Sequence, residues 1–127
     1  HKFIEKAIEK GAKAIVCEVL PVEFIPSITY VKVDDSNIAL AIAASNYYDN
    51  PSSKLKLIGV TGTNGKTTIA TLLYRLFKKL NYKSGLLSTI KIMIDDVEVK
   101  TTHTTPDSLK LNNVLSQMVE EGVEYCF

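Results

Sequence analysis

Residues 55–68 read Leu-Lys-Leu-Ile-Gly-Val-Thr-Gly-Thr-Asn-Gly-Lys-Thr-Thr and carry the main information about the fold. The apolar run over residues 55–60 is typical of a buried strand, and it leads directly into the glycine-rich stretch 62–68. Residues 69–80 then place apolar side chains at helical spacing. A strand, a glycine-rich loop and a helix follow one another in the order that a phosphate-binding loop requires.

The residue types in this loop suit the binding of a nucleoside triphosphate. Gly62 and Gly65 allow the tight backbone turn that directs successive amide N–H groups at phosphate oxygens. Lys66 would reach the β- and γ-phosphates of ATP, and the Thr67 hydroxyl would bind Mg²⁺. A simple turn before a helix, with a solvated lysine, is the alternative, but the flanking strand and helix favour binding. The predicted ATP-binding residues are Gly62, Thr63, Asn64, Gly65, Lys66, Thr67 and Thr68.

The loop departs from the generic phosphate-binding pattern at one position, because Val60 stands where that pattern has its first glycine. The string Gly59-Val60-Thr61 followed by Gly-Thr-Asn-Gly-Lys-Thr-Thr instead resembles the Mur ligase family of ATP-dependent enzymes, which add amino acids to the nucleotide-linked precursor of peptidoglycan. Folylpolyglutamate synthetases look similar but usually carry Gly-Lys-Gly-Ser. The Thr67-Thr68 pair therefore favours the Mur branch.

A second segment, His103-Thr104-Thr105-Pro106-Asp107, resembles the Thr-Thr-Pro motif of the family branch that adds the third peptide residue. In that branch the paired threonines bind the UDP-linked substrate, and the resemblance carries this role to Thr104 and Thr105. The residue before them is often Asn in the family, whereas here it is His103. A helix entry with hydroxyl caps is the alternative for the same residues.

The resemblance implies a reaction, its cofactors and its substrates. The γ-phosphate of ATP would pass to a substrate carboxylate, and an amine would attack the acyl phosphate to form an amide, with Lys66 as the catalytic residue and Mg²⁺ at Thr67. The substrates would be UDP-N-acetylmuramoyl-L-Ala-D-Glu and diaminopimelate or L-lysine, in the cytoplasm. Another Mur-family or folylpolyglutamate-type ligase, a nucleotide-hydrolysing switch and a non-catalytic nucleotide-binding module are the alternatives.

The remaining sequence predicts an α/β chain. Helices are expected over residues 3–10, 38–47, 69–80 and 106–121, and strands over 14–19, 29–33, 55–60, 86–87, 90–94, 97–101 and 123–127. The turn-rich segment 49–53 suggests a linker. By resemblance, residues 1–48 would be the back part of a small α/β UDP-substrate-binding domain, and residues 54–127 the start of a P-loop ATPase domain with a mainly parallel sheet.

Composition excludes several other classes of protein. The net charge is +1, from 15 Lys and Arg against 14 Asp and Glu, so no strong basic field is present to hold nucleic acid or an anionic membrane. Cys17 and Cys126 lie far apart and form no zinc-binding or disulfide pattern. No apolar run approaches the roughly 20 residues of a membrane-spanning helix. No membrane, nucleic-acid or obligate protein partner is therefore expected.

Overall fold

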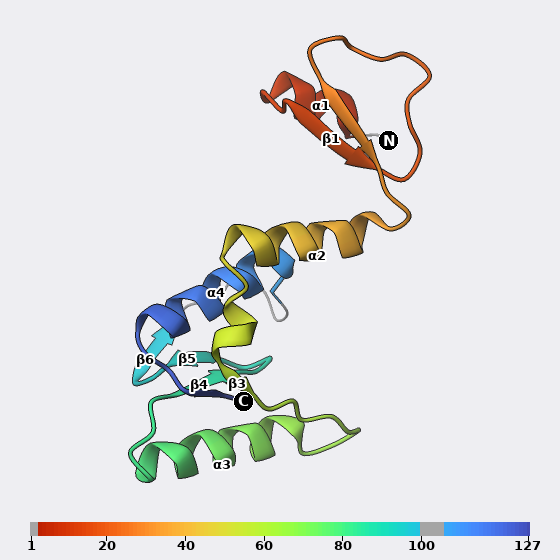
Figure 1. Ribbon diagram of the computed structural model, residues 1–127. Helices are drawn as coiled ribbons and strands as arrows, with labels where there is room; N and C mark the ends of the chain where they lie inside the picture. Colours follow the sequence, from red (N-terminus) through yellow and green to blue (C-terminus); the bar gives the residue numbers. More distant parts are fainter. Residues whose placement is uncertain (1–2, 100–105) are drawn as a thin grey trace. The chain divides into compact units, whose positions relative to one another are not determined.

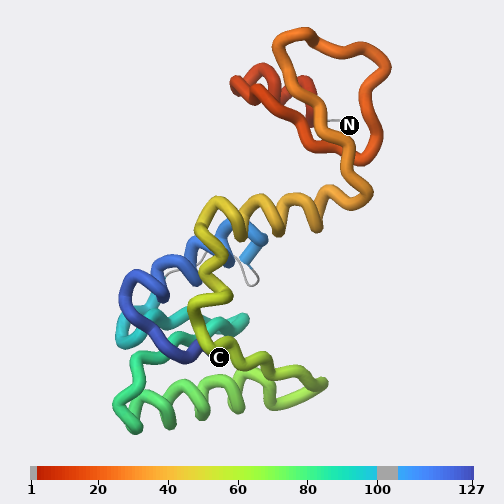
Figure 2. The backbone as a smooth tube through the Cα atoms, in the orientation of Figure 1, coloured from red at the N-terminus to blue at the C-terminus, as the bar shows by residue number. Residues whose placement is uncertain are grey.

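The computed structural model describes residues 3–99 and 106–127. The chain divides into two compact units, His1–Ala43 and Ala44–Phe127. Both units combine helices with strands, as the ribbon and backbone views show (Figures 1 and 2). The predicted α/β class is confirmed. No helix among the described residues is both long enough and apolar enough to span a membrane.

The first unit is built on two parallel strands. Helix α1 (Ile4–Glu9) precedes β1 (Ala14–Cys17), and β1 pairs in parallel with β2 (Thr29–Lys32). Helix α2 (Ser36–Tyr47) then begins and runs across the division between the units. Asp35 caps α2, since one of its carboxylate oxygens accepts hydrogen bonds from the amides of Asn37 and Ile38 at 2.7 and 3.0 Å.

Glu18 ties the end of β1 to the start of α2. Its carboxylate accepts hydrogen bonds from the Ser36 amide at 2.9 Å and from the Ser36 hydroxyl at 2.8 Å. These bonds, the backbone one first, hold the pKa of Glu18 below its usual value. The charged form of Glu18 therefore favours this helix start.

The segment 49–53, expected to be a linker, packs into the second unit instead. It overlaps a short 3₁₀ helix, η1 (Pro51–Lys54), in which Pro51 is buried. Asp49 and Asn50 adopt positive φ angles, and Asp49 pairs with Lys54. The turn-forming residues thus build a compact corner, and the division lies within α2, between Ala43 and Ala44. The assignment of the two parts to substrate-binding and ATPase domains remains a prediction.

The second unit contains a five-stranded sheet with the strand order β3-β7-β4-β5-β6. The helices on this sheet are α3 (Lys66–Lys79) and α4 (Ser108–Glu120). The strands are β3 (Lys56–Leu57), β4 (Ser84–Leu87), β5 (Ile92–Ile94), β6 (Val97–Val99) and β7 (Tyr125–Cys126).

The sheet is mixed, so the prediction of a mainly parallel sheet was wrong. β7 pairs in parallel with β3 and β4, whereas β5 pairs antiparallel with both β4 and β6. The reason is the length of the connections. Short turns join β4 to β5 and β5 to β6, and a parallel pairing needs a crossover of a dozen or more residues.

Helices α3 and α4 cover opposite faces of the sheet (Figure 1). On the α4 face, Leu115 and Met118 pack with Ile92, Ile94 and Cys126. On the α3 face, the buried residues are Ala70, Tyr74, Leu86 and Phe127. Two apolar cores therefore hold the sheet from both sides and fix where the loop before α3 begins.

Polar contacts also join α3 to the turn between β5 and β6. Tyr74 donates its hydroxyl hydrogen to the backbone oxygen of Asp95 at 2.7 Å. Lys78 forms ion pairs with Asp95 and Asp96, and the hydrogen bonds to these carboxylates raise the pKa of Lys78. These contacts hold α3 against the turn of the β5–β6 hairpin.

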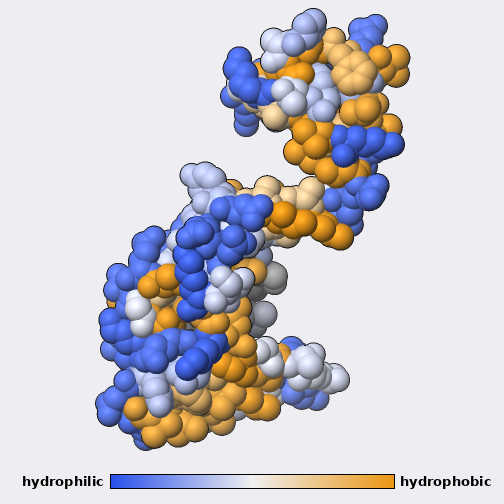
Figure 3. All heavy atoms as spheres, viewed as in Figure 1, coloured by the Kyte–Doolittle hydropathy of each residue, from blue (hydrophilic) through white to orange (hydrophobic). Residues whose placement is uncertain are grey.

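The outer side of α3 carries an exposed apolar stripe, which is visible in the hydropathy view (Figure 3). The stripe consists of Ile69, Leu72, Leu76 and Leu80, with exposed fractions between 48% and 59%. Their spacing of three or four residues places them on one side of the helix, opposite the buried Ala70 and Tyr74. Helix α3 is therefore apolar on two sides.

Gly85 allows α4 to approach β4 closely, and this contact leads to a stability prediction. A Cβ atom at Gly85 would lie 2.7 Å from the sulfur and 2.8 Å from the terminal methyl carbon of Met118, which is fully buried. We expect Gly85→Ala to lower the free energy of unfolding by about 1–3 kcal/mol, because the displaced Met118 has little free space. Urea unfolding of the full-length protein measures this change.

The control is Gly59→Ala, because an added Cβ there would meet nothing within 4 Å and the backbone angle is not in the left-handed region. In the double variant Gly85→Ala/Met118→Ala, the two losses should be less than additive, since the shortened side chain removes the clash. Equal stability of Gly85→Ala and the wild type would contradict this account of the packing.

Candidate functional site

The glycine-rich loop connects β3 to α3, and its backbone conformation depends on two glycines. Gly62 has a φ angle of +146° and Gly65 a φ angle of +81°, which residues with a side chain rarely adopt. The loop extends away from the sheet before the chain returns as α3 (Figure 2). β3 is held in place because Ile58 donates its amide hydrogen to the backbone oxygen of Cys126 at 2.9 Å. The predicted geometry of a strand, a tight loop and a helix is present.

The first turn of α3 has no side-chain cap, unlike the starts of the two other long helices. Gly65 occupies the capping position, and no side chain in the part of the chain that the structure describes accepts a hydrogen bond there. By contrast, Asp107 caps α4 by accepting from the Lys110 amide at 2.8 Å, and Asp35 caps α2. The first amides of any helix lack partners within the helix and carry its positive end. The start of α3 therefore presents amide donors suited to an anion.

Lys66 is the first residue of α3, and its side chain folds over the loop. Its ammonium group donates to the backbone oxygen of Gly62 at 2.5 Å and lies 3.4 Å from that of Thr63. The side chain is exposed, so these are contacts within the loop and not part of the core. The positive charge thus lies next to the amides at the start of α3, where a phosphate group would need it.

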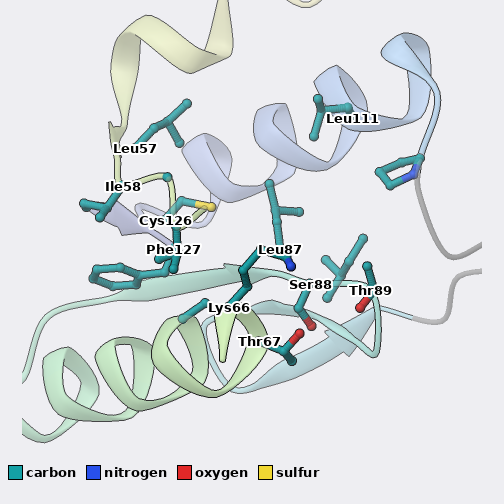
Figure 4. Close-up of a pocket in the computed structure, with 15 residues that line it drawn as sticks. Leu57, Ile58, Lys66, Thr67, Leu87, Ser88, Thr89, Leu111, Cys126 and Phe127 are labelled. Carbon is teal, nitrogen blue, oxygen red and sulfur yellow. The ribbon is translucent and has the colours of Figure 1, made fainter. Parts of the chain in front are cut away.

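A cavity of about 470 Å³ opens beside the loop (Figure 4). Lys66 and Thr67 line it from α3, while Ser88 and Thr89 line it from the end of β4. In the close-up, the labelled hydroxyls of Thr67, Ser88 and Thr89 gather at one end, and Ile58 and Phe127 lie toward the other. The remaining lining residues are Leu57, Gly59, Val60, Ala70, Leu87, Ile92, Pro106, Leu111 and Cys126. The cavity therefore combines a mainly apolar wall with a few polar groups, as ligand sites do.

Of the predicted ATP-binding residues, Lys66 and Thr67 line the cavity. Gly62, Thr63, Asn64 and Gly65 form the exposed loop before it, and Thr68 lies exposed in the first turn of α3. The predicted residues therefore form one continuous segment, which reaches the edge of the cavity at Lys66 and Thr67.

The chemistry of the donors in this segment fits a magnesium nucleotide. Mg²⁺ keeps several water molecules and usually takes one or two protein oxygens together with phosphate oxygens. The half-buried Thr67 hydroxyl can supply one such oxygen. Within residues 3–99 and 106–127, no group of three or more His, Cys, Asp or Glu side chains lies close enough to hold a metal. The Thr67 hydroxyl therefore suits an ion that is bound together with a nucleotide.

The predicted substrate threonines, Thr104 and Thr105, lie outside the described residues. The adjoining Pro106 lines the cavity. Asp107 caps α4, so the start of that helix already has its side-chain acceptor. Pro106 therefore lies at the same cavity that Lys66 borders.

Sequence reasoning did not identify Ser88 and Thr89 as site residues. A hydroxyl pair directly after the apolar Leu86-Leu87 was the available indication, because ligands bind beyond the carboxyl ends of parallel strands. Cys126 also lines the cavity, and burial raises the pKa of its thiol to about 12. The neutral thiol is a poor nucleophile. The other polar side chains that line the cavity are Lys66, Thr67, Ser88 and Thr89.

Comparison with curated proteins gives long, continuous matches. The chain is 59% identical over 128 residues to UDP-N-acetylmuramoyl-L-alanyl-D-glutamate–2,6-diaminopimelate ligase of Cytophaga hutchinsonii, and 55% identical over 127 residues to the ligase of the same name of Bacteroides fragilis. Both matches cover 100% of this chain and 26% of the relative. A ligase of the same name from Clostridium acetobutylicum is 48% identical over 126 residues. The chain thus spans about a quarter of the length of these relatives.

A solved structure of a UDP-N-acetylmuramoyl-L-alanyl-D-glutamate–2,6-diaminopimelate ligase has a similar fold. It superimposes with a TM-score of 0.77 at 25% identity, covering 98% of this chain and 25% of that one. The family model described as the Mur ligase middle domain matches residues 60–127, which include the loop, most of the residues that line the cavity and all of α3 and α4. On this match, the chain belongs to the Mur ligase family.

Proposed function

We propose that the protein containing this chain is an ATP-dependent amide ligase of peptidoglycan precursor synthesis. It would add the third amino acid to UDP-N-acetylmuramoyl-L-Ala-D-Glu in the cytoplasm. The names of the relatives favour 2,6-diaminopimelate over L-lysine as that amino acid. In this proposal, residues 1–48 complete the UDP-substrate-binding domain and residues 54–127 begin the ATPase domain.

The observation that carries the proposal is the arrangement around Lys66. Lys66 and Thr67, at the uncapped start of α3, line the same cavity as Pro106. A ligase of this kind must bring two anions together, the terminal phosphate of ATP and a substrate carboxylate. A positive group beside a cavity that is open to both supports such a reaction.

The residues of this chain act mainly by binding and charge neutralisation. The amides of residues 62–68 would orient the phosphates, and Lys66 would stabilise the negative charge that develops on the transferred phosphoryl group. The Thr67 hydroxyl would hold Mg²⁺, which supplies further charge neutralisation when bound. The carboxylate oxygen forms a bond to the γ-phosphorus while the bond to the β–γ bridging oxygen breaks and ADP leaves. The amine then displaces phosphate from the acyl phosphate.

The full-length protein tests the proposal directly. With Mg-ATP, UDP-N-acetylmuramoyl-L-Ala-D-Glu and diaminopimelate, it should produce ADP and the UDP-linked tripeptide in equal amounts. Parallel reactions with L-lysine determine which amino acid is used. ADP release that continues without the muramyl substrate would contradict the ligase proposal and would favour a nucleotide-hydrolysing module.

A further inference from the structure

The turn after β4 places two further hydroxyls at the cavity, at the same end as the Thr67 hydroxyl (Figure 4). β4 ends at Leu87, and the next two residues, Ser88 and Thr89, both line the cavity that Lys66 and Thr67 border. Figure 4 shows the hydroxyl oxygens of Ser88 and Thr89 on the same side as that of Thr67. Two elements that are separate in sequence, the start of α3 and the end of β4, therefore supply polar groups to one space.

Ser88 and Thr89 differ in what their hydroxyls do. The Ser88 hydroxyl donates to the backbone oxygen of Lys91 at 2.8 Å and accepts from the Lys91 amide at 3.1 Å. The Ser88 amide also donates to the same Lys91 oxygen at 3.1 Å. These three bonds close the turn. The Ser88 hydroxyl therefore already donates one hydrogen bond and accepts another within the turn. Thr89 is exposed at the tip of this turn, and its hydroxyl makes no hydrogen bond within residues 3–99 and 106–127.

We propose that the Thr89 hydroxyl donates a hydrogen bond to the substrate carboxylate that attacks the γ-phosphate. The inference rests on the proposed function, because it assigns a group to the acid substrate of that reaction. A carboxylate that enters a mainly apolar cavity loses water, and each oxygen without a donor is costly there. A donor on the cavity wall would offset this cost.

Elimination among the described lining residues points to Thr89. Lys66 and the loop amides lie at the phosphate side, and Thr67 is the candidate ligand of Mg²⁺. The Ser88 hydroxyl is already committed to its turn, and the Cys126 thiol is a weak donor. Thr89 remains as the exposed hydroxyl that the turn after β4 supplies to the cavity.

The role of Thr89 is to bind and orient, with no change in its own covalent bonds. Its proton stays on the threonine oxygen while the carboxylate forms its bond to phosphorus and ADP departs. A carboxylate held at a fixed angle reaches the phosphorus more often in a productive geometry. Loss of the hydroxyl should therefore affect both the affinity for the acid substrate and the rate of phosphoryl transfer.

The test uses the full-length enzyme with Thr89→Val, which keeps the shape of the side chain and removes the hydroxyl. The kcat/KM for UDP-N-acetylmuramoyl-L-Ala-D-Glu should fall about tenfold, as expected for a lost hydrogen bond to a charged group. The KM for ATP should stay within about twofold of the wild type.

Thr89→Ser keeps the donor and should retain most of the activity. Thr71→Val is the matched control, because Thr71 lies on α3 and does not line the cavity.

Three results would overturn the inference while leaving the proposed function intact. They are unchanged kcat/KM in Thr89→Val, an equal loss in Thr89→Ser accompanied by a lower melting temperature, and a rise in the KM for ATP instead of that for the acid substrate. The second result would assign Thr89 to the turn, and the third would assign it to the phosphates. If the wild-type enzyme releases ADP without the acid substrate, the proposed function fails and the inference fails with it.

Discussion

Lys66→Ala should lower kcat/KM for ligation by about a hundredfold or more in the full-length enzyme and leave the fold intact. Removing one preorganised donor to a charge that develops in the transition state typically costs this much. Lys66 is exposed, and its contacts are with loop carbonyl oxygens, so its loss removes little packing. Initial rates of ADP release over a range of substrate concentrations, with circular dichroism for the fold, check both parts.

The matched control for this substitution is Lys79→Ala. Lys79 is an exposed lysine in the last turn of the same helix, so it tests for a general loss of positive charge on α3. Its activity should stay close to that of the wild type. Activity of Lys66→Ala within a few-fold of the wild type would remove Lys66 from the mechanism.

Replacing both Thr104 and Thr105 with alanine should weaken binding of the UDP-linked substrate and leave Mg-ATP binding nearly unchanged. Each hydroxyl bonded to a charged substrate group contributes about 1.5–3 kcal/mol, so loss of one such bond should raise the dissociation constant about tenfold or more, and loss of both should raise it more than about a hundredfold. Calorimetric titration of the full-length protein with each ligand measures the two affinities separately.

The capping residue of α4 provides the control for the threonine pair. Asp107→Ala removes the acceptor of the Lys110 amide and should lower stability by about 1 kcal/mol without a comparable loss of substrate affinity. If the double threonine variant behaves in the same way, with a lower melting temperature and an unchanged dissociation constant, the threonines contribute to structure and not to binding.

Local sequence patterns predicted most of the helices and strands of this chain. Strands on either side of Asp95 and Asp96, a helix that starts near Pro106 and a strand near the end of the chain were expected, and the structure has all of them. Hydrogen bonds between near neighbours dominate in helices and tight turns, so a short stretch of sequence specifies them. Gly62 and Gly65 likewise indicated the loop, because few other residues adopt its backbone angles.

Several boundaries depended on contacts that no local pattern specifies. β3 pairs with β7 over Lys56 and Leu57, although the apolar run continues to Val60. α3 begins at Lys66, three residues before the first predicted helical position, since the loop turns directly into the helix. The segment 49–53 packs as a corner, because its turn residues are satisfied by one another and Pro51 is buried.

The sequence by itself determined the loop, the residue types that suit phosphate and the family resemblance, because these reside in consecutive residues. Only the tertiary structure decided what surrounds them. It brought Thr89 and Pro106 to the cavity beside Lys66, and it placed Gly85 against Met118. Such neighbours are set by which strands pair and which helix packs on which face of the sheet. These long-range contacts depend on the burial of apolar surface across the whole unit, a property of the folded chain and not of any short segment.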